Sequence, residues 1–181
     1  AFHGYSLYDF FFPKKDYDKK LSLLIEVLIK ETGKHGILYA DSEKVNGLAQ
    51  WFPPGYTGSS LFNHIYCGAW KFLFASDFFG TYNRMSQYED FATKHKSGLT
   101  QNNDVFLYLL AVRKSMQKKG ISSKLVSPML EYAKSINRPC FLETHEQKNV
   151  ALYEHMGFKL LSTAKMAGTS VTYYPMMYKV D

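Results

Sequence analysis

The segments FLYLLAV (106–112), RKSMQKKGISS (113–123), CFLET (140–144) and NVALYEHMGF (149–158) follow one another in the second half of a chain of 181 residues. FLYLLAV is an apolar and aromatic run that is too short for a typical helix and stops at Arg113, which is the pattern of a buried strand. Apolar side chains then recur at helical spacing: Leu125, Met129, Tyr132 and Ala133. We therefore expect strands over 104–112 and 140–144, a helix from Gly120 to about Asn137, a helix over 149–156, and final strands near 158–164 and 172–179.

The turn between the first of these strands and the helix is suited to an anion. Gln117, Lys118, Lys119 and Gly120 directly precede the helical pattern, so the backbone N–H groups of residues 117–123 are expected to point outward at a helix N-terminus, where a phosphate is favoured. The basic residues around it are Arg113, Lys114, Lys118, Lys119 and Lys124. The alternative is an ordinary strand-to-helix turn.

Two segments carry a family resemblance. Gln117-Lys118-Lys119-Gly120-Ile121-Ser122 resembles the acetyl-CoA signature Q/R-x-x-G-x-G/A of the GNAT N-acetyltransferases. FLETHEQKNVALYEHMGF (141–158) is similar to the GNAT segment in which a strand, an Asn, a Tyr and a Gly-Phe turn follow in order. With AF at the start and WFPPG at 51–55, the chain resembles the branch that includes puromycin N-acetyltransferase. Ser122 stands where the family usually has Gly or Ala, which let backbone and pyrophosphate approach closely.

The resemblance implies an α/β GNAT fold, with a mixed, mostly antiparallel central sheet flanked by helices and a splay between its two central strands. It also implies that the pantetheine of acetyl-CoA lies in this splay, with the backbone N–H of Val112 polarising the thioester carbonyl. The implied cofactor-binding residues are Leu110, Val112, Gln117, Lys118, Lys119, Gly120, Ser122, Ser123 and Asn149.

Tyr153 matches the family's Tyr, which implies that it is the general acid. A phenol with a pKa of about 10 can protonate a departing thiolate whose conjugate acid has a pKa of about 8.5. The alternative is a tyrosine packed under the Gly157-Phe158 turn. Asn149 matches the family's Asn and is expected to bind the pantetheine arm or to place the following helix; a plain helix N-cap is the alternative.

Glu143 is the candidate base or anchor for the substrate's ammonium group, because it ends CFLET near the expected splay. Strand alternation places Cys140 and Leu142 on one face and Phe141 and Glu143 on the other. A salt bridge to a nearby Lys or Arg is the alternative for the Glu143 carboxylate.

Trp51, Phe52 and Tyr56 are candidates for the wall of an acceptor pocket suited to a partly apolar or aromatic amine. Core packing is the alternative and the more common fate of such aromatic side chains. The substrate itself does not transfer from the resemblance, because acceptor pockets are grafted on a shared scaffold.

The first half of the chain is expected to form a helix over 19–32, an antiparallel hairpin of strands 36–40 and 45–52, and a broadly helical stretch over 61–96 that is broken at Gly68 and Gly80. Asp18 is the expected N-cap of the first helix and Gly33 lies just past its end. We expect one domain over 1–181. Because AF stands near the end of the first helix in the branch it resembles, an opening strand is expected to be missing before Ala1.

Composition restricts the class of protein. The formal charge of +6 fits an anionic cofactor, and no zinc spacing, recognition helix or RNA-binding aromatic signature favours nucleic acid. No long apolar run indicates a membrane span, and the start AFHGYSLYDF lacks a signal peptide's basic and apolar regions, so a cytoplasmic protein is expected. The spacing of the six histidines and two cysteines predicts no metal site.

These observations lead us to expect an acetyl-CoA-dependent N-acetyltransferase that transfers an acetyl group directly to a primary amine of a small molecule. A catalytically inactive acyl-CoA-binding sensor and a basic nucleic-acid-binding protein are the alternatives. The expected partners are acetyl-CoA and a small-molecule amine, without nucleic acid, membrane or metal, and a homodimer stays open.

Overall fold

The structure of the protein is a computed structural model that describes residues 2–13, 15–56, 61–100 and 103–180. Its helices are α1 (Ser6–Phe11), α2 (Tyr17–His35), α3 (Leu61–Tyr66), η1 (Ala69–Phe74), α4 (Phe78–Lys96), η2 (Lys114–Met116), α5 (Ile121–Ser135) and α6 (Gln147–His155), of which η1 and η2 are 3-10 helices. Its strands are β1 (Ile37–Ala40), β2 (Gly47–Phe52), β3 (Val105–Val112), β4 (Cys140–Thr144), β5 (Lys159–Leu160), β6 (Ala164–Lys165) and β7 (Thr172–Tyr178).

The strands of the described ranges form one mixed sheet of seven strands, in the order β1-β2-β3-β4-β7-β5, with β6 paired to β7. Every described pairing is antiparallel except that of β3 with β4. The expected α/β class with a mixed, mostly antiparallel sheet is therefore confirmed. At one end of this sheet, β1 exposes 38% of Ile37 and 41% of Leu38.

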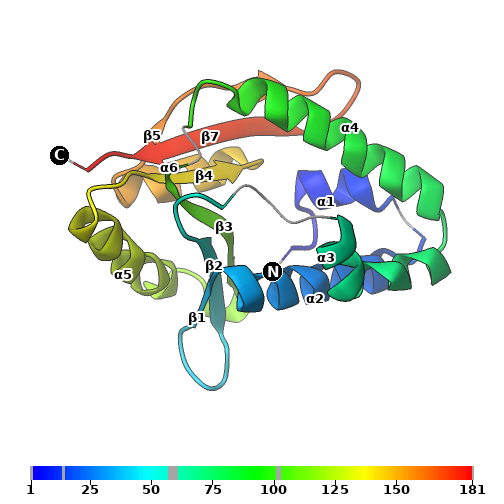
Figure 1. Cartoon of the computed structure of the whole chain (residues 1–181), viewed down its shortest axis with the longest axis horizontal. Helices are drawn as coiled ribbons and strands as arrows, with labels where there is room; N and C mark the ends of the chain where they lie inside the picture. The colour runs from blue at the N-terminus through cyan, green and yellow to red at the C-terminus, as the bar shows by residue number, and fades with distance from the viewer. Residues whose placement is uncertain (1, 14, 57–60, 101–102, 181) are drawn as a thin grey trace.

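Helices cover both faces of the sheet (Figure 1), and each face has its own hydrophobic core. The first core lies under α5 and α6, where Met129 and Val150 meet Trp51 and Leu142 of the sheet. The second core joins α1, α2, η1 and α4 to Tyr173 of β7. Burial of both faces explains why the strand sequences are nearly continuous apolar runs.

Helix α5 lies close to β2 because β2 begins with a glycine. A Cβ at Gly47 would meet Ile121 Cγ2 at 2.5 Å and Leu125 Cδ1 at 2.9 Å, so only glycine permits this approach. The helix ends in a Schellman motif, in which Asn137 has a φ of 50° and the N–H of Arg138 donates to the C=O of Ala133 at 2.9 Å.

The two central strands part in the middle of the sheet. β3 and β4 are paired only over 105–107 and 140–142, although β3 continues to Val112. In the pairing with β2, Gln50 lies opposite Leu109 and Trp51 opposite Leu107, so Tyr108 is the extra residue of a β-bulge. The expected splay therefore begins at this bulge.

Several expected element boundaries differ from the structure. The first helix extends over 17–35 and passes through Gly33, with Asp16 rather than Asp18 at its N-cap. β2 starts at Gly47 instead of Val45, because Val45 has a φ of 48° and the carboxylate of Asp41 accepts the Gly47 N–H at 2.7 Å to close the turn. Gly80 does not break a helix.

Gly80 lies inside α4, and the break comes earlier, at Asp77, whose φ is 56°. The break at Gly68 is confirmed, with a φ of 109°. The strand expected over 158–164 consists of two short strands, β5 and β6, that pair with different parts of β7. Helix α1 was not predicted; its short apolar run buries Leu7, Tyr8 and Phe11 in the second core.

No helix in the described part of the chain is both long and apolar enough to cross a membrane.

Candidate active site

The edge of β3 beyond the bulge faces the space between β3 and β4. Arg113 donates its backbone N–H to Asn46 next to β2 at 2.8 Å, whereas Val105 at the other end donates to Pro139 next to β4 at 2.8 Å. Backbone groups alternate along a strand, and the extra residue at Tyr108 shifts this alternation by one. Leu110 and Val112 therefore turn their backbone N–H and C=O groups toward the gap, at the two positions that the family resemblance implies.

The turn after β3 leads from this edge to the N-terminus of α5. Gln117 donates its side-chain N–H to the backbone C=O of Val112 at 3.3 Å, which ties the turn to the strand edge. Gly120 is the N-cap with a φ of 75°, and no side chain caps the helix. Lys118 is also left-handed, with a φ of 62°.

The first turn of α5 has unpaired backbone donors. Lys124 donates to the C=O of Gly120 at 3.1 Å, as the first intrahelical bond. The N–H groups of Ile121, Ser122 and Ser123 precede this bond and have no acceptor within the helix. The side chains of Ser122 and Ser123 are half-buried, and residues 117–120 are exposed. The donors and the left-handed glycine fit a diphosphate, and an anion site at this helix end stays a prediction.

Positive charge surrounds the same turn. The basic side chains on the turn and in the first turn of α5 are all exposed: Arg113, Lys114, Lys118, Lys119 and Lys124. Within the described ranges, none of them forms an ion pair with a carboxylate. Their charges are therefore available to an anionic ligand.

Asn149 and Tyr153 lie on α6, which follows β4. Asn149 donates from Nδ2 to the hydroxyl of Thr144 at 3.1 Å, so its amide bridges α6 to the last residue of β4. Glu146 rather than Asn149 is the N-cap of α6. The Tyr153 ring is buried and packs edge-on against Phe158, with the centroids 5.9 Å apart. Burial raises the pKa of Tyr153 well above its usual value, with the charge of Tyr5 as a smaller cause, so the hydroxyl keeps its proton.

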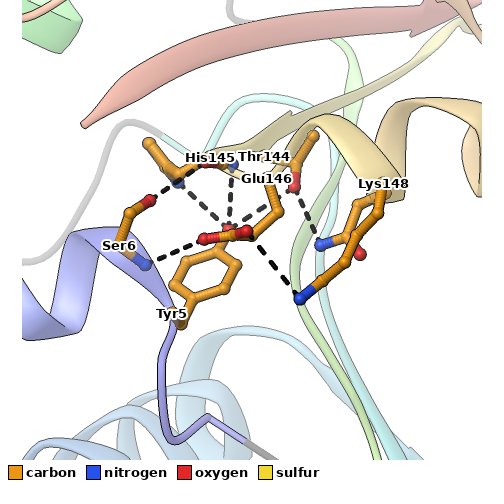
Figure 2. Close-up of polar contacts among 7 residues, drawn as sticks. Tyr5, Ser6, Thr144, His145, Glu146 and Lys148 are labelled. Atoms are coloured by element: carbon orange, nitrogen blue, oxygen red, sulfur yellow. Dashed lines mark hydrogen bonds and ion pairs between the residues drawn. The ribbon is translucent and has the colours of Figure 1, made fainter. Parts of the chain in front are cut away.

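A group of polar residues that the sequence did not indicate joins the start of α1 to the end of β4 (Figure 2). The Tyr5 hydroxyl accepts the backbone N–H of His145 at 3.0 Å and lies 3.1 Å from His145 Nδ1. Ser6 donates its backbone N–H to Glu146 at 2.9 Å and its hydroxyl to the C=O of His145 at 3.0 Å. These contacts link residues about 140 positions apart, which no local pattern reveals.

Glu143 forms an ion pair with Lys96 of α4, with 3.1 Å between Oε1 and Nζ. The same ammonium lies 4.4 Å from the centroid of the Phe106 ring and 5.0 Å from that of Phe141. The salt-bridge alternative for Glu143 is thus present in the structure. The carboxylate still lies on the α4 side of the sheet beside the splay, so its role toward a substrate stays a prediction.

The three aromatic residues expected around an acceptor lie on different faces. Trp51 is fully buried in the core under α5, which is its packing alternative. Phe52 and Tyr56 lie on the opposite face and stack with their centroids 3.8 Å apart. The Tyr56 hydroxyl donates to Glu31, which His64 also contacts at 3.3 Å. Phe52 is also buried, with 1% of its surface exposed, so its packing alternative is present as well, and Tyr56 is the more accessible member of the pair.

Neither cysteine is suited to nucleophilic attack. Cys67 and Cys140 are both buried and free. Burial raises the pKa of Cys140 to about 12, with the charge of Asp104 as a further cause, so its thiol does not ionise near neutral pH. Within the described residues, no three side chains of His, Cys, Asp or Glu gather where they could hold a metal ion.

Comparisons with known proteins show what this chain resembles in sequence and in fold. An uncharacterized N-acetyltransferase of Schizosaccharomyces pombe is 24% identical over 115 residues, which are 62% of this chain and 47% of that protein. The chain thus matches about half the length of this relative. A crystal structure of a histone acetyltransferase HPA2 and related acetyltransferase from Corynebacterium glutamicum superposes with a TM-score of 0.59 at 18% identity, covering 93% of this chain and 79% of that one.

The comparison with protein families identifies the family of the chain. The sequence profile of the acetyltransferase (GNAT) family matches residues 5–158. This range contains the parted strands β3 and β4, the turn before α5, and the Asn149 and Tyr153 positions of α6. The chain therefore belongs to the GNAT family of acetyltransferases.

Proposed function

We propose that the protein is an acetyl-CoA-dependent N-acetyltransferase that transfers the acetyl group directly to a primary amine of a small molecule. The observation that carries this proposal is the parting of β3 from β4 at the Tyr108 bulge, which leaves the gap-facing backbone of Leu110 and Val112 without a strand partner in the described sheet. An extended pantetheine arm has amide groups that suit such an edge. When bound, acetyl-CoA supplies an activated acyl thioester.

The residues of the chain account for binding along the whole cofactor. The backbone groups of Leu110 and Val112 pair with the pantetheine, and the Val112 N–H polarises the thioester carbonyl. The hydrogen bond from Asn149 Nδ2 to the Thr144 hydroxyl, 3.1 Å long, holds the Asn149 amide in place. In this proposal the amide acts beside the pantetheine arm. The pyrophosphate takes the free N–H groups at the start of α5, with Gly120 and Ser122 in the turn and Lys118 and Lys119 neutralising its charge.

Tyr153 provides the proton for the departing thiolate. Its hydroxyl is protonated at neutral pH, as is that of an ordinary tyrosine, and α6 holds it on the core side of the gap. Burial raises its pKa, which makes the phenol a weaker acid toward the thiolate than a free tyrosine. Glu143 lies on the other side, where an amine would approach, and it is the candidate base or ammonium anchor. Lys96 already contacts one oxygen of the Glu143 carboxylate at 3.1 Å. For Glu143 to act on an amine, this ion pair has to weaken.

Direct transfer is favoured over an acetyl-enzyme. An acetyl-enzyme by way of cysteine requires an accessible thiolate, whereas Cys67 and Cys140 are buried and the pKa of Cys140 is raised to about 12 by its burial. The amine therefore attacks the thioester in a ternary complex. Cytoplasmic localisation fits this use of acetyl-CoA and is part of the proposal.

The acceptor is proposed to be a partly apolar or aromatic amine. Phe52 and Tyr56 form a stacked aromatic pair with centroids 3.8 Å apart on the face of α2 and α4, and the buried carboxylate of Glu31 lies beside it. The WFPPG motif and the N-V-x-L-Y-E-x-x-G-F pattern resemble the branch that includes puromycin N-acetyltransferase.

The test has two steps. Acetyl-CoA should first raise the melting temperature, because a ligand at about 100 times its Kd adds roughly 2.7 kcal/mol to the free energy of unfolding. A library of primary amines is then incubated with acetyl-CoA and the protein, and released coenzyme A thiol is measured against a sample without amine. We expect release with aromatic amines above that background.

Other outcomes point to the alternatives. Stabilisation by acetyl-CoA without thiol release from any amine, peptide N-termini included, would identify an acyl-CoA sensor. Release of coenzyme A thiol with peptides but with no small amine would indicate that the substrates are proteins. If acetyl-CoA does not stabilise the protein and the protein binds DNA or RNA in a salt-sensitive way, the proposal that acetyl-CoA is the cofactor would be contradicted.

A further inference from the structure

The large hydrophobic residues that the described part of the chain exposes are concentrated in one short segment. Of fourteen such residues, seven lie between positions 65 and 82. Six of these seven expose between 49% and 79% of their surface, and we call them the aromatic patch: Tyr66, Trp70, Leu73, Phe74, Phe79 and Tyr82. Single exposed hydrophobic residues are ordinary, whereas a concentration of this kind marks an interaction site.

The aromatic patch lies on α3, on η1 and on the start of α4, and both α-helices pack against η1. Side chains three positions apart eclipse in a 3-10 helix, so Trp70 and Leu73 leave η1 on the same side. The ring centroids of Trp70 and Phe74 are 6.1 Å apart. In α4, Phe79 and Tyr82 are also three positions apart and share one helical face. The patch is therefore a surface carried by packed elements.

The segment that carries the aromatic patch is anchored from beneath. Phe72 of η1 is buried in the second core, where its ring stacks with that of Phe12 at a centroid distance of 6.3 Å. Lys71 of η1 pairs with Glu26 of α2, with 2.7 Å between Nζ and Oε1. Elements that are already held in place lose less conformational entropy on binding, so the patch is preorganised for a partner.

The area of the aromatic patch fits a protein interface. At about 200 Å² for a large apolar side chain, its six residues leave roughly 800 Å² in contact with water. The largest apolar patch on a typical monomer measures about 300–600 Å². A stable interface of standard size buries about 800 Å² of each partner. The patch alone thus supplies the surface that one partner contributes to such an interface.

The charged side chains around the aromatic patch are paired within the chain. The Glu26 carboxylate contacts Lys30 at 2.6 Å and Lys71 at 2.7 Å. Arg84 contacts Asp77 at 2.7 Å. Because cations and carboxylates alternate around the patch, a second copy of the same surface can approach it with little repulsion between like charges.

The same pairs disfavour a membrane as the partner. Segments that bind anionic lipids carry clusters of roughly four to eight Lys or Arg residues. Lys34 adds one cation beside the aromatic patch, but its ammonium lies over the ring of Tyr66, 3.5 Å from the centroid. Trp, Tyr and Phe side chains, which make up most of the patch, are the types enriched at the centre of protein interfaces.

We propose that the aromatic patch is the interface of a homodimer, in which two copies of this chain pair through it about a twofold axis. In such an interface the same surface faces itself, so η1 of one copy lies against η1 of the other. Trp70 and Phe74 then fill the buried centre. Tyr66 and Tyr82, at the two ends of the segment, keep their hydroxyls at the wet rim. This inference does not depend on the proposed function.

The pairing leaves the proposed cofactor site open. In Figure 1 the start of α4 lies at the right of the molecule, whereas α5 lies at the left. Residues 117–120, in the turn before α5, are exposed and lie outside the aromatic patch. Variants that break the dimer should therefore bind acetyl-CoA as the wild type does.

The first test measures the mass in solution by analytical ultracentrifugation. We expect the wild type to have the mass of two chains between about 1 and 100 µM. Phe74→Asp and Phe79→Asp each bring a carboxylate into the apolar interface, so each should raise the dimer Kd by about 30-fold or more. Both side chains are exposed in the single chain, so both variants should keep the circular dichroism spectrum of the wild type.

Leu38→Asp is the matched control. Leu38 exposes 41% of its surface on β1, outside the aromatic patch, so the same change of an exposed apolar residue to a carboxylate should leave the dimer intact.

The fluorescence of Trp70 provides a second measurement. The chain has two tryptophans, and Trp51 is buried in the first core of each copy, so a change in emission reports on Trp70. At equal concentration, emission should lie at a longer wavelength in Phe79→Asp than in the wild type, because Trp70 returns to water. The difference should disappear when both proteins also carry Trp70→Phe.

Three results would overturn the homodimer. One is a wild type that stays monomeric up to about 100 µM; if this monomer also sediments with vesicles of phosphatidylcholine and phosphatidylserine, the aromatic patch binds lipid instead. Another is a dimer that persists in both Phe74→Asp and Phe79→Asp. The last is a dimer that dissociates in Leu38→Asp, which would place the interface at the exposed β1 end of the sheet.

Discussion

The ring of Tyr153 is held by packing, and its hydroxyl is the group that the proposed mechanism uses. The centroid of the Tyr153 ring lies 5.9 Å from that of Phe158, so the packing proposed as the alternative role of Tyr153 is present. Helix α6 keeps the residue in the core beside the splay. A tyrosine can stabilise the Gly157-Phe158 turn and still donate a proton, so packing and catalysis are compatible at this position. The two uses are separable because only the second needs the oxygen.

Replacement of Tyr153 by Phe tests that separation. We expect kcat to fall by about 100-fold or more, the usual contribution of a general acid, with the Kd of acetyl-CoA within about twofold of wild type. Kinetics of thiol release and calorimetric binding measure the two quantities. Tyr132→Phe, at an exposed position of α5, is the control and should change neither. Unchanged turnover in Tyr153→Phe would remove it from the mechanism.

His145 also makes a prediction for stability. Its folded pKa of about 3 lies below its ordinary value of 6.5, because burial disfavours the charged ring. The unfolded chain therefore binds one more proton between these two values, so acid favours unfolding there. As pH falls from about 6.5 toward 3, His145 should lower the free energy of unfolding by about 1.4 kcal/mol per pH unit.

Urea unfolding as a function of pH measures this dependence. The free energy of unfolding of His145→Gln is compared with that of wild type at each pH, which cancels the contributions of the carboxylates that both proteins share. The variant should lose less stability per pH unit than wild type below about pH 6.5. Parallel curves for the two proteins would show that His145 protonates equally in both states.

Among the elements, the turn before α5 has the clearest relation between backbone and function. Gly120 has a φ of 75°, and a Cβ there would meet no atom within 4 Å. The cost of a side chain at this position is therefore conformational rather than steric. The same residue sets the direction of the first N–H groups of α5, which are the proposed phosphate donors.

Gly120→Ala should lower the free energy of unfolding by about 1 kcal/mol, because the left-handed conformation is unfavourable for an L-residue. It should also weaken acetyl-CoA binding. Gly33→Ala is the matched control, since Gly33 lies in α2 without a positive φ and a Cβ there would also meet no atom within 4 Å; it should raise stability by up to about 1 kcal/mol. Chemical denaturation and calorimetry measure both variants, and equal effects would contradict the argument.

Elements also show where local patterns stop being informative. β3, β4 and α5 were predicted because their apolar patterns are strong and are bounded by turn residues. α1 is only six residues long and lacks a helical repeat; its contacts with Glu146 and His145, about 140 residues away, hold it in place. The Tyr108 bulge has no sequence signature either, because it results from the register between β2 and β3.

At the scale of the whole molecule, the formal charge of +6 is partly concentrated around one helix end. The exposed Lys118 and Lys119 stand in a turn whose described basic residues lack ion pairs. Salt screens interactions among exposed charges over about 8 Å at physiological ionic strength. The affinity for a phosphorylated cofactor should therefore depend on salt.

The double variant Lys118→Gln/Lys119→Gln should bind acetyl-CoA about fivefold more weakly at low salt, which corresponds to about 1 kcal/mol. Its affinity should also vary less with salt than that of wild type. Lys165→Gln, at an exposed position of β6, is the control for the change in net charge and should bind as wild type does. Calorimetric titrations at several salt concentrations provide the comparison, and equal salt dependence in all three proteins would exclude a role for the turn.

The sequence by itself determined the strand, turn and helix of the second half and the resemblance to GNAT proteins, and it predicted an anionic ligand, because each depends on residues close together in the chain. Only the tertiary structure decided that Trp51 lies in the core while Phe52 and Tyr56 lie on the opposite face, that Lys96 pairs with Glu143, and that the Tyr108 bulge turns Leu110 and Val112 toward the gap. It also brought Tyr5 and Tyr88 to His145. Such contacts join distant segments, and their geometry depends on strand register and on how the helices pack, neither of which is encoded in a local pattern.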